Sequence, residues 1–219
     1  MLRPRSFTVL LALACGLLLA GCNLFQPRTP ESPSKAGVRI DYSEPDSTLQ
    51  TMARGIESKA GSIGRTAYLG GLADSSIGEG PDFNAFFDPA AVVIWQGVSG
   101  RNPPARWDRS REEQLYSYVL NLSGNGYSFL WRTDVEHPND EDLALNVKLL
   151  HRRYLLAAIP EVGGAADTLA IGYADLTLTR SLIADKWVVW RWQDRVDPTV
   201  GPNPSKGKQS FSALRLGSY

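Results

Sequence analysis

The stretch DTLAIGYADLTLTRSLIADKWVVWRWQDRV, residues 167–196, indicates the fold class of this chain. In both halves apolar and polar residues alternate over short distances, which is typical of strands whose two faces differ. The four residues SLIA separate the halves and are typical of a hairpin connection. The stretch therefore predicts two long antiparallel strands joined by a turn.

Two more strand-like segments precede this hairpin, at residues 127–136 and 142–159. The turn-rich words HPND and PEVGGAA separate these segments from one another and from the hairpin. Four strands that follow one another in this way predict an antiparallel meander.

Helical periodicity characterises the chain before the strands. Ser47 stands three residues before Gln50, and this capping-box pattern predicts that a helix begins at Ser47. Glycines at 55, 61 and 64 predict a break near 61–65, and a second helical piece is expected at 65–74.

The region between these helices and the meander contains one short strand and one clear helix in our interpretation. We expect a strand from about Ala90 to Trp95, because this part is rich in Val and Ile. Residues 106–122 predict a helix with Asp108 or Ser110 as N-cap and two glutamates in its first turn. Its apolar stripe is formed by Leu115, Tyr118, Val119 and Leu122.

Helices followed by an antiparallel meander predict an α+β domain. We place this domain at residues 47–197. Residues 198–219 are expected to form a Pro/Gly-rich loop and a C-terminal segment packed on the domain.

The N-terminus predicts export. Arg3 and Arg5 precede an apolar run that is too short for a comfortable membrane span, and small residues follow it, as in a secretory signal peptide. The ending Leu-Ala-Gly-Cys resembles the lipobox of bacterial lipoproteins, which implies that residues 1–21 are removed and that Cys22 is acylated. The alternatives are an ordinary signal peptide that happens to end near a cysteine, or an N-terminal anchor helix.

The resemblance also implies a location. Asn23 follows Cys22, and by the sorting rules of Gram-negative lipoproteins the absence of Asp there favours the outer membrane, facing the periplasm. Residues 22–46 are rich in proline and polar residues and predict a semi-extended tether. The only other cysteine is Cys15, inside the signal, so the mature domain is expected to have no disulfide and no thiol ligand for a metal.

Composition narrows the partner classes. The 219 residues include 23 basic and 23 acidic side chains, so the chain has no basic excess for binding nucleic acid. We expect no cofactor, and a dimer is left open.

The order of elements resembles the nuclear transport factor 2-like superfamily (the SnoaL-like, cystatin-like cone), and most closely its uncharacterised exported lipoproteins. The resemblance rests on four sequence segments: YL…LAD at 68–74, WDRSREE at 107–113, GYADL at 172–176 and WVVWRWQD at 187–194. The resemblance implies helices packed on the concave face of a strongly curved, mainly antiparallel sheet, and a final packed segment at SFSALRL. Enzymes of this superfamily usually place an Asp, His or Tyr deep in the cone, but none of their motifs transfers here residue by residue.

Two interpretations of Asp194 follow from the hairpin. Pairing across SLIA aligns residues whose numbers add up to about 367, such as Leu178 with Val189 and Asp175 with Trp192. This register makes Leu176 and Leu178 core residues and leaves the face of Trp192 and Asp194 outside, unless a bulge near Arg191 turns Trp192 inward. We expect Asp194 to cap the turn that follows the strand; the alternative is a catalytic carboxylate in an aromatic pocket.

The two histidines differ in setting. His137 lies in a turn and is expected to be exposed. His151 follows a period-two run of apolar residues and is expected near the pocket rim, opposite about Asp175. The pair could act as a general base, although a modest surface ion pair is the more common arrangement. We expect no zinc site from two histidines so far apart in the sequence.

These observations leave three functions. The leading hypothesis is a non-catalytic domain that binds a small apolar ligand or an envelope protein. The alternatives are a small pocket enzyme of the isomerase, cyclase or hydrolase type using His151 and an acid, and a structural envelope protein whose cone is filled by side chains. The pocket residues expected under the first hypothesis are Trp95, Tyr118, Tyr173 and Trp192.

Overall fold

A computed structural model describes residues 38–59, 61–122, 125–160, 164–181, 183–200 and 210–219. The chain divides into two units, residues 1–37 and 38–219, and the second unit is the one described below. The predicted signal peptide, Cys22 and most of the tether lie outside the described residues. No described helix has the length and apolar character needed to cross a membrane.

Six strands form one sheet in the order β1-β6-β5-β4-β2, with β3 added beside β4. The strands are β1 (Asn84–Phe86), β2 (Gly126–Thr133), β3 (Glu141–Ala144), β4 (Val147–Ile159), β5 (Asp167–Ser181) and β6 (Lys186–Val196). The pairs β2–β4, β4–β5 and β5–β6 are antiparallel, whereas β1 runs parallel to β6. The predicted meander is confirmed, with one difference: residues 142–159 make most of a β3–β4 hairpin rather than one strand.

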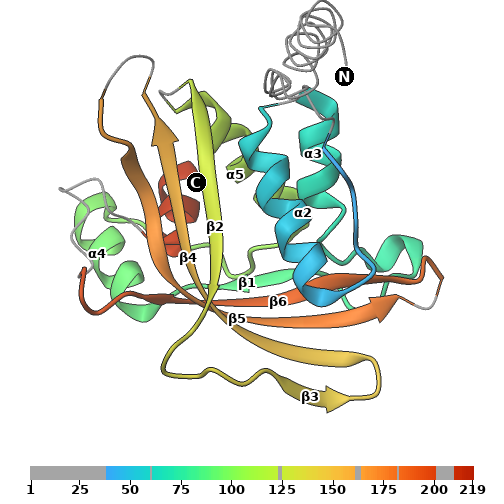
Figure 1. Ribbon diagram of the computed structural model, residues 1–219. Helices are drawn as coiled ribbons and strands as arrows, with labels where there is room; N and C mark the ends of the chain where they lie inside the picture. Colours follow the sequence, from blue (N-terminus) through green and yellow to red (C-terminus); the bar gives the residue numbers. More distant parts are fainter. Residues whose placement is uncertain (1–37, 60, 123–124, 161–163, 182, 201–209) are drawn as a thin grey trace, which may run out of the picture. The chain divides into compact units, whose positions relative to one another are not determined.

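Helices cover the concave face of this sheet: two of them make most of the contacts with it, and the others pack mainly on those two. The helices are α2 (Pro45–Glu57), α3 (Gly61–Leu69), α4 (Pro89–Ser99), α5 (Arg109–Asn121) and α6 (Phe211–Ser218), with a short 3-10 helix at Ser75–Ile77. In Figure 1, β2 and β4 stand nearly upright while β5 and β6 run across the view, and this curvature surrounds α5 and α6. The α+β class and the helix-on-concave-sheet arrangement are therefore confirmed.

The first helix begins two residues before the predicted start. Glu44 is its N-cap residue and makes no side-chain cap, and Pro45 occupies the first turn. Proline suits this position because its fixed φ is already helical and its missing N–H has no intrahelical partner there. The predicted capping box of Ser47 is wrong for this reason. The folded unit also starts earlier than residue 47, since the hydroxyl of Tyr42 donates to the carbonyl of Ala67 at 3.1 Å.

Helix α4 replaces the strand that we expected at 90–95. The side chain of Asp88 accepts hydrogen bonds from the N–H groups of Ala90 (2.8 Å) and Ala91 (3.3 Å), and Pro89 follows the cap. These two residues supply an N-cap and a pre-organised first turn, and together they outweigh the strand preference of the Val-Val-Ile run.

Helix α5 starts as predicted, with Asp108 as N-cap accepting from the N–H of Arg111 at 3.0 Å. The buried side chains of α5 lie on a face that is rotated about the helix axis from the predicted face. Tyr116 is buried, whereas Tyr118 is 37% exposed.

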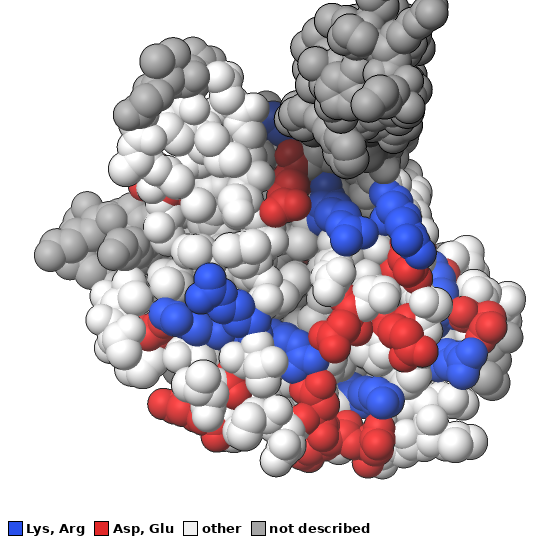
Figure 2. Space-filling model, in the orientation of Figure 1, with Lys and Arg blue, Asp and Glu red and all other residues white. Residues whose placement is uncertain are grey.

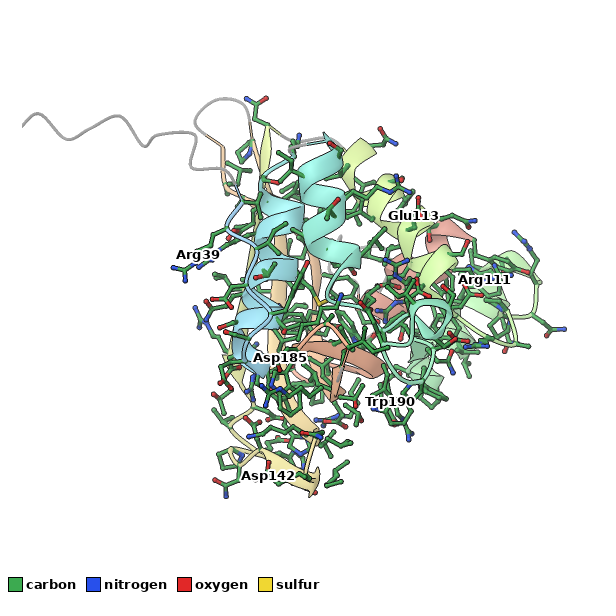
Figure 3. All side chains as sticks on the ribbon, turned by 90° about the vertical axis from the view of Figure 1, so that its right-hand side faces the viewer. Arg39, Arg111, Glu113, Asp142, Asp185 and Trp190 are labelled. Carbon is green, nitrogen blue, oxygen red and sulfur yellow. The ribbon has the colours of Figure 1, made fainter. Side chains whose placement is uncertain are left out.

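A bulge in the β5–β6 hairpin determines which side chains of β6 face the core. Leu178 pairs with Val189 as predicted, but beyond a register shift between Thr177 and Leu178 the partner of Leu176 is Trp192. The extra residue is Trp190, which is half-buried (Figure 3). Leu176, Leu178, Val189 and Trp192 are all 0% exposed, so the predicted core face is right and the bulge brings Trp192 into it.

Candidate functional site

The concave side of the sheet is filled by helix α6. The ring of Phe211 lies 4.9 Å from the ring of Trp192 and 5.0 Å from that of Tyr154, between ring centroids. Trp131 adds a further contact, 5.4 Å from Trp192. Phe211 and Trp192 are 0% exposed. The aromatic residues that could have lined an open pocket are therefore packed against one another and against α6.

A buried ion pair joins α5 to α6 in this interior. Arg215 donates from Nε and Nη2 to the two carboxylate oxygens of Glu112, each at 2.9 Å. Glu112 also accepts from Trp107 Nε1 at 2.6 Å and from the Tyr68 hydroxyl at 2.7 Å. Burial and the neighbouring Glu112 raise the pKa of Tyr68, which keeps the hydroxyl a donor. The four donors satisfy a carboxylate that has no contact with water.

Asp194 anchors the start of α6. Its Oδ1 accepts from the Tyr154 hydroxyl and its Oδ2 from the N–H of Ser212, both at 2.6 Å. The same Tyr154 oxygen accepts from the N–H of Phe211 at 3.0 Å. The first N–H groups of a helix have no partner within the helix, so these two side chains supply the missing acceptors. Burial raises the pKa of Asp194, against the lowering effect of Arg215 and of its hydrogen bonds.

The predicted partner of Asp194 was wrong. We expected it to cap the turn after the strand, and that role belongs to Asp197, which accepts from the N–H and the hydroxyl of Thr199 at 2.9 and 2.6 Å. The bulge explains the error, because it directs Asp194 into the interior.

His151 and Asp175 do form the predicted pair. They are register partners on β4 and β5, and His151 Nδ1 lies 2.8 Å from Asp175 Oδ1. The core-facing neighbours of His151 on its strand are Leu150 and Tyr154, so side-chain alternation places His151 on the opposite, outer face of the sheet. The expected position at the rim of a pocket in the cone is therefore wrong, and His151 cannot act together with Asp194.

The four expected pocket residues do not converge. Trp192 lies in the core, and Tyr173 lies on the outer face with the guanidinium groups of Arg153 and Arg195 at 5.9 and 5.5 Å from its ring. Trp95 contacts Tyr219 at the surface, with 6.2 Å between ring centroids, and Tyr118 is partly exposed on α5.

Among the hollows on the described surface, a small one of about 170 Å³ is lined by two arginines and four apolar or aromatic residues of β2, β4 and β5. Two larger hollows contain charged residues of both signs. One, of about 390 Å³, lies between α2 and β2, and the other, of about 300 Å³, lies beside the start of α5. Both are lined by arginines and carboxylates together, and Figure 2 shows such mixed charge over the face formed by α2 and β2. Mixed charge of this kind selects neither an anionic nor a cationic ligand.

Sequence reasoning missed the roles of Glu112 and Arg215. The sequence predicted only that Glu112 lies in the first turn of its helix, where a negative charge is favourable. A signal was present, because Glu112 precedes Leu115 by three residues and Tyr116 by four and therefore shares their face of the helix.

Comparisons with known proteins concern the fold. No family model matches the chain, and no curated protein sequence matches it. Among solved structures, the chain is similar to an NTF2-like protein with a cystatin-like fold from Novosphingobium aromaticivorans, with 9% identity, a TM-score of 0.46, and 73% of this chain and 81% of that chain covered. It is also similar to an NTF2-like protein of unknown function from Pseudomonas putida, with 12% identity, a TM-score of 0.43, and coverage of 70% and 84%.

Both of these solved structures are described as NTF2-like proteins. A protein of unknown function from Mycobacterium tuberculosis is similar as well, with 11% identity, a TM-score of 0.48, and coverage of 79% and 82%. The resemblance expected from the sequence is confirmed for the fold. At such identities the NTF2-like likeness carries no information about activity, because one fold hosts many functions.

Proposed function

We propose that this protein is a non-catalytic binding protein of the cell envelope, held at the membrane through Cys22, that docks a protein partner on helix α4. The observation that carries the proposal is the exposure of α4. Of its 11 residues only Ala91 is buried, although the helix is apolar over most of its length.

The exposed apolar side chains of α4 form one surface with its neighbours. Val93 is 67% exposed and Val98 is 81% exposed. Trp95 of the same helix packs beside Tyr219. We call Val93, Trp95, Val98, Arg101 and Tyr219 the α4 surface. A helix that is apolar all round is normally buried, so an exposed one indicates a partner.

The chemistry of the α4 surface favours a protein partner with an apolar face and an acidic rim. Arg101 and Arg111 place their guanidinium groups 4.8 and 5.0 Å from the ring of Tyr219, and Arg101 lies 5.9 Å from the ring of Trp95 (Arg111 is labelled in Figure 3). Trp, Tyr and Arg are the residue types that contribute most to binding at protein interfaces. The two guanidinium groups complement carboxylates at the edge of such a partner.

The filled interior argues against the enzyme alternative. Asp194 and Tyr154, the buried acid and hydroxyl closest to a proton-transfer pair, both bind the backbone of α6. The space beside them holds Phe211 and Arg215, which are 0% exposed. A substrate would have to displace this helix.

Site-specific crosslinking in cells tests the proposal. A photo-crosslinking amino acid replaces Val98, and in a matched control it replaces Leu145, which is 96% exposed at the β3–β4 turn. We expect one protein adduct from position 98 and none from position 145. The captured protein, once identified and purified, should bind the full chain at least tenfold more weakly when Val93→Asp or Arg101→Glu is introduced.

Several results would contradict the proposed docking of a protein partner on α4. Adducts with lipid alone, with a second copy of this chain, or with the same proteins from both positions would each exclude a dedicated protein partner at α4. Thermal melting of Val93→Asp serves as the folding control, because exposed substitutions change stability by only about 0.5 kcal/mol.

A further inference from the structure

The two histidines of the chain meet on the outer face of the sheet, although 13 residues separate them in the sequence. The loop after β2 brings His137 over β4, and the ring centroids of His137 and His151 lie 5.3 Å apart. His151 is 7% exposed, whereas the His137 side chain is 52% exposed. One imidazole is therefore fixed in the sheet and the other lies at the surface above it.

Each imidazole is oriented by its own carboxylate, and in both rings the contact is made by Nδ1. His151 Nδ1 lies 2.8 Å from Asp175 Oδ1, and His137 Nδ1 lies 3.3 Å from Asp134 Oδ2. Arg195 Nη2 joins the two carboxylates, at 3.0 Å from Asp134 and 3.1 Å from Asp175. A neutral histidine that donates from Nδ1 keeps a lone pair on Nε2. This arrangement is the one found for histidines that bind metals.

The Nε2 atom of His151 faces another carboxylate. Glu141 Oε1 lies 3.5 Å from it. With His151 neutral, a lone pair and a carboxylate oxygen repel each other at this distance, unless a proton or a metal ion lies between them. The other ring has a second carboxylate beside it, since ligand atoms of Asp134, Glu136 and His137 all lie within 4.8 Å of one another.

The charge of the cluster suits a cation. Asp134, Glu136, Glu141 and Asp175 contribute four negative charges, and Arg195 contributes one positive charge. Neutral imidazoles and carboxylates together are ligands that zinc and its neighbours in the first transition series prefer.

We propose that His137, His151 and Glu141, with Glu136 beside them, bind one divalent transition-metal ion of the zinc class. Asp175 is a positioning residue that holds the His151 ring through Nδ1. The contact of Asp134 with His137 Nδ1 is longer, at 3.3 Å, and is given up when the His137 ring turns. A tetrahedral zinc ion with bonds of about 2.0–2.1 Å brings its nitrogen ligands to within about 3.4 Å of each other, so the exposed His137 ring must turn toward His151 on binding. The site is independent of the α4 surface, and it reverses our sequence-based expectation that no metal binds.

The test is a titration of the full chain in detergent with Zn²⁺, followed by calorimetry. Cys15→Ser and Cys22→Ser are introduced first, because thiolates would bind zinc themselves. Co²⁺ serves as a second probe, since its visible absorption reports the coordination geometry. We expect one equivalent of Zn²⁺ per chain. His137→Gln and His151→Gln should each weaken binding by at least tenfold, and Asp175→Asn by about 10–100-fold, as loss of an orienting partner does.

The matched control is Asp185→Asn, an acid in the β5–β6 turn whose side chain is 79% exposed. It should bind Zn²⁺ like the parent chain. The proposal is overturned if the parent chain binds no Zn²⁺, or if both histidine variants bind it with unchanged affinity. Because His137 is half-exposed, its variant should stay folded even if His151→Gln does not, and circular dichroism verifies this.

Discussion

Asp194 uses both carboxylate oxygens inside the protein, one on the hydroxyl of Tyr154 and one on the N–H of Ser212. Its position near the end of β6, two residues before Val196, resembles that of a catalytic acid, but its partners are the groups that start α6. The same two hydrogen bonds explain why a charged residue is tolerated there at 1% exposure.

We predict that Asp194→Ala lowers the free energy of unfolding by about 1–3 kcal/mol, because it leaves the Ser212 N–H without its acceptor in a buried site. Asp194→Asn retains an acceptor oxygen and the shape of the side chain, and should cost less. Urea unfolding of the two variants measures the difference. Equal losses in both would show that the hydrogen bond to Ser212 is not what the residue contributes.

Because the pKa of Asp194 is raised, this residue makes the free energy of unfolding depend on pH. Between the ordinary aspartate pKa of 3.8 and the raised pKa in the folded state, the folded state holds more protons than the unfolded state. The free energy of unfolding should therefore fall as pH rises through this window and stay level above it, as far as this group contributes. Asp194→Asn removes this contribution. A parent and a variant with parallel stability–pH curves above pH 3.8 would contradict the prediction.

A substitution of Leu178 tests which face of the sheet forms the core. Leu178 is 0% exposed and pairs with Val189 in the sheet. Leu178→Ala should lower the free energy of unfolding by about 2–5 kcal/mol, through lost burial and a remaining cavity. Leu145→Ala, at a site that is 96% exposed, is the control and should change stability by about 0.5 kcal/mol or less.

At the scale of elements, periodicity predicted the strands, but not the positions where periodicity breaks. The alternation through β6 is consistent with two registers that differ by one residue. The bulge at Trp190 switches from one to the other, so that Trp192 follows Val189 on the core face and Arg191, whose charge would be costly to bury, stays exposed. A single sequence does not show where that switch occurs. Helix α4 is a local example. Asp88 and Pro89 precede the apolar run in the sequence and cap the helix, but the expectation of a strand did not take them into account.

The sequence predicted one part of the candidate sites and not the others. Register arithmetic correctly paired His151 with Asp175 across β4 and β5. It did not predict the contact of His137 with His151, because that contact depends on how the loop after β2 folds over the sheet. It did not predict the pair of Glu112 with Arg215 either, since 102 residues separate them in the sequence.

The ion pair between α5 and α6 leads to a prediction at the scale of elements. Arg215→Met should lower the free energy of unfolding by about 3–5 kcal/mol, because the buried Glu112 carboxylate loses its cationic partner. Adding Glu112→Gln should restore part of the loss, since Gln remains within reach of Trp107 and Tyr68 without carrying a charge. Thermal or urea unfolding of the single and double variants decides this. A double variant less stable than Arg215→Met alone would show that the two side chains do not act as a pair.

At the scale of the whole molecule, the sequence predicts separate roles for the N-terminal segment and the folded unit. Cys22 lies outside the described residues, and the lipid anchor stays a prediction from the sequence. The unit from residue 38 onward holds together without a disulfide, through a core that includes four tryptophans or tyrosines exposed by 1% or less: Tyr68, Trp107, Tyr154 and Trp192.

Cys22→Ser tests the anchor. Because this cysteine is the acyl acceptor in the proposed lipoprotein, the variant should move from the membrane fraction to the soluble periplasmic fraction of cells. Cys15→Ser, which removes the other cysteine, should leave the protein in the membrane fraction. Continued membrane association of Cys22→Ser would rule out acylation at this residue as the means of attachment.

Helix α6 also has a consequence for the order of events during biosynthesis. Phe211 and Arg215 occupy the middle of the core, so a nascent chain that has reached only the end of β6 exposes the aromatic groups that these residues will cover. The domain can therefore complete its folding only after α6 has left the ribosome. If the chain is exported as the sequence predicts, it would still be open when it enters a translocation channel. A chain ending at residue 209 should accordingly be degraded rapidly by proteases that leave the full-length protein intact.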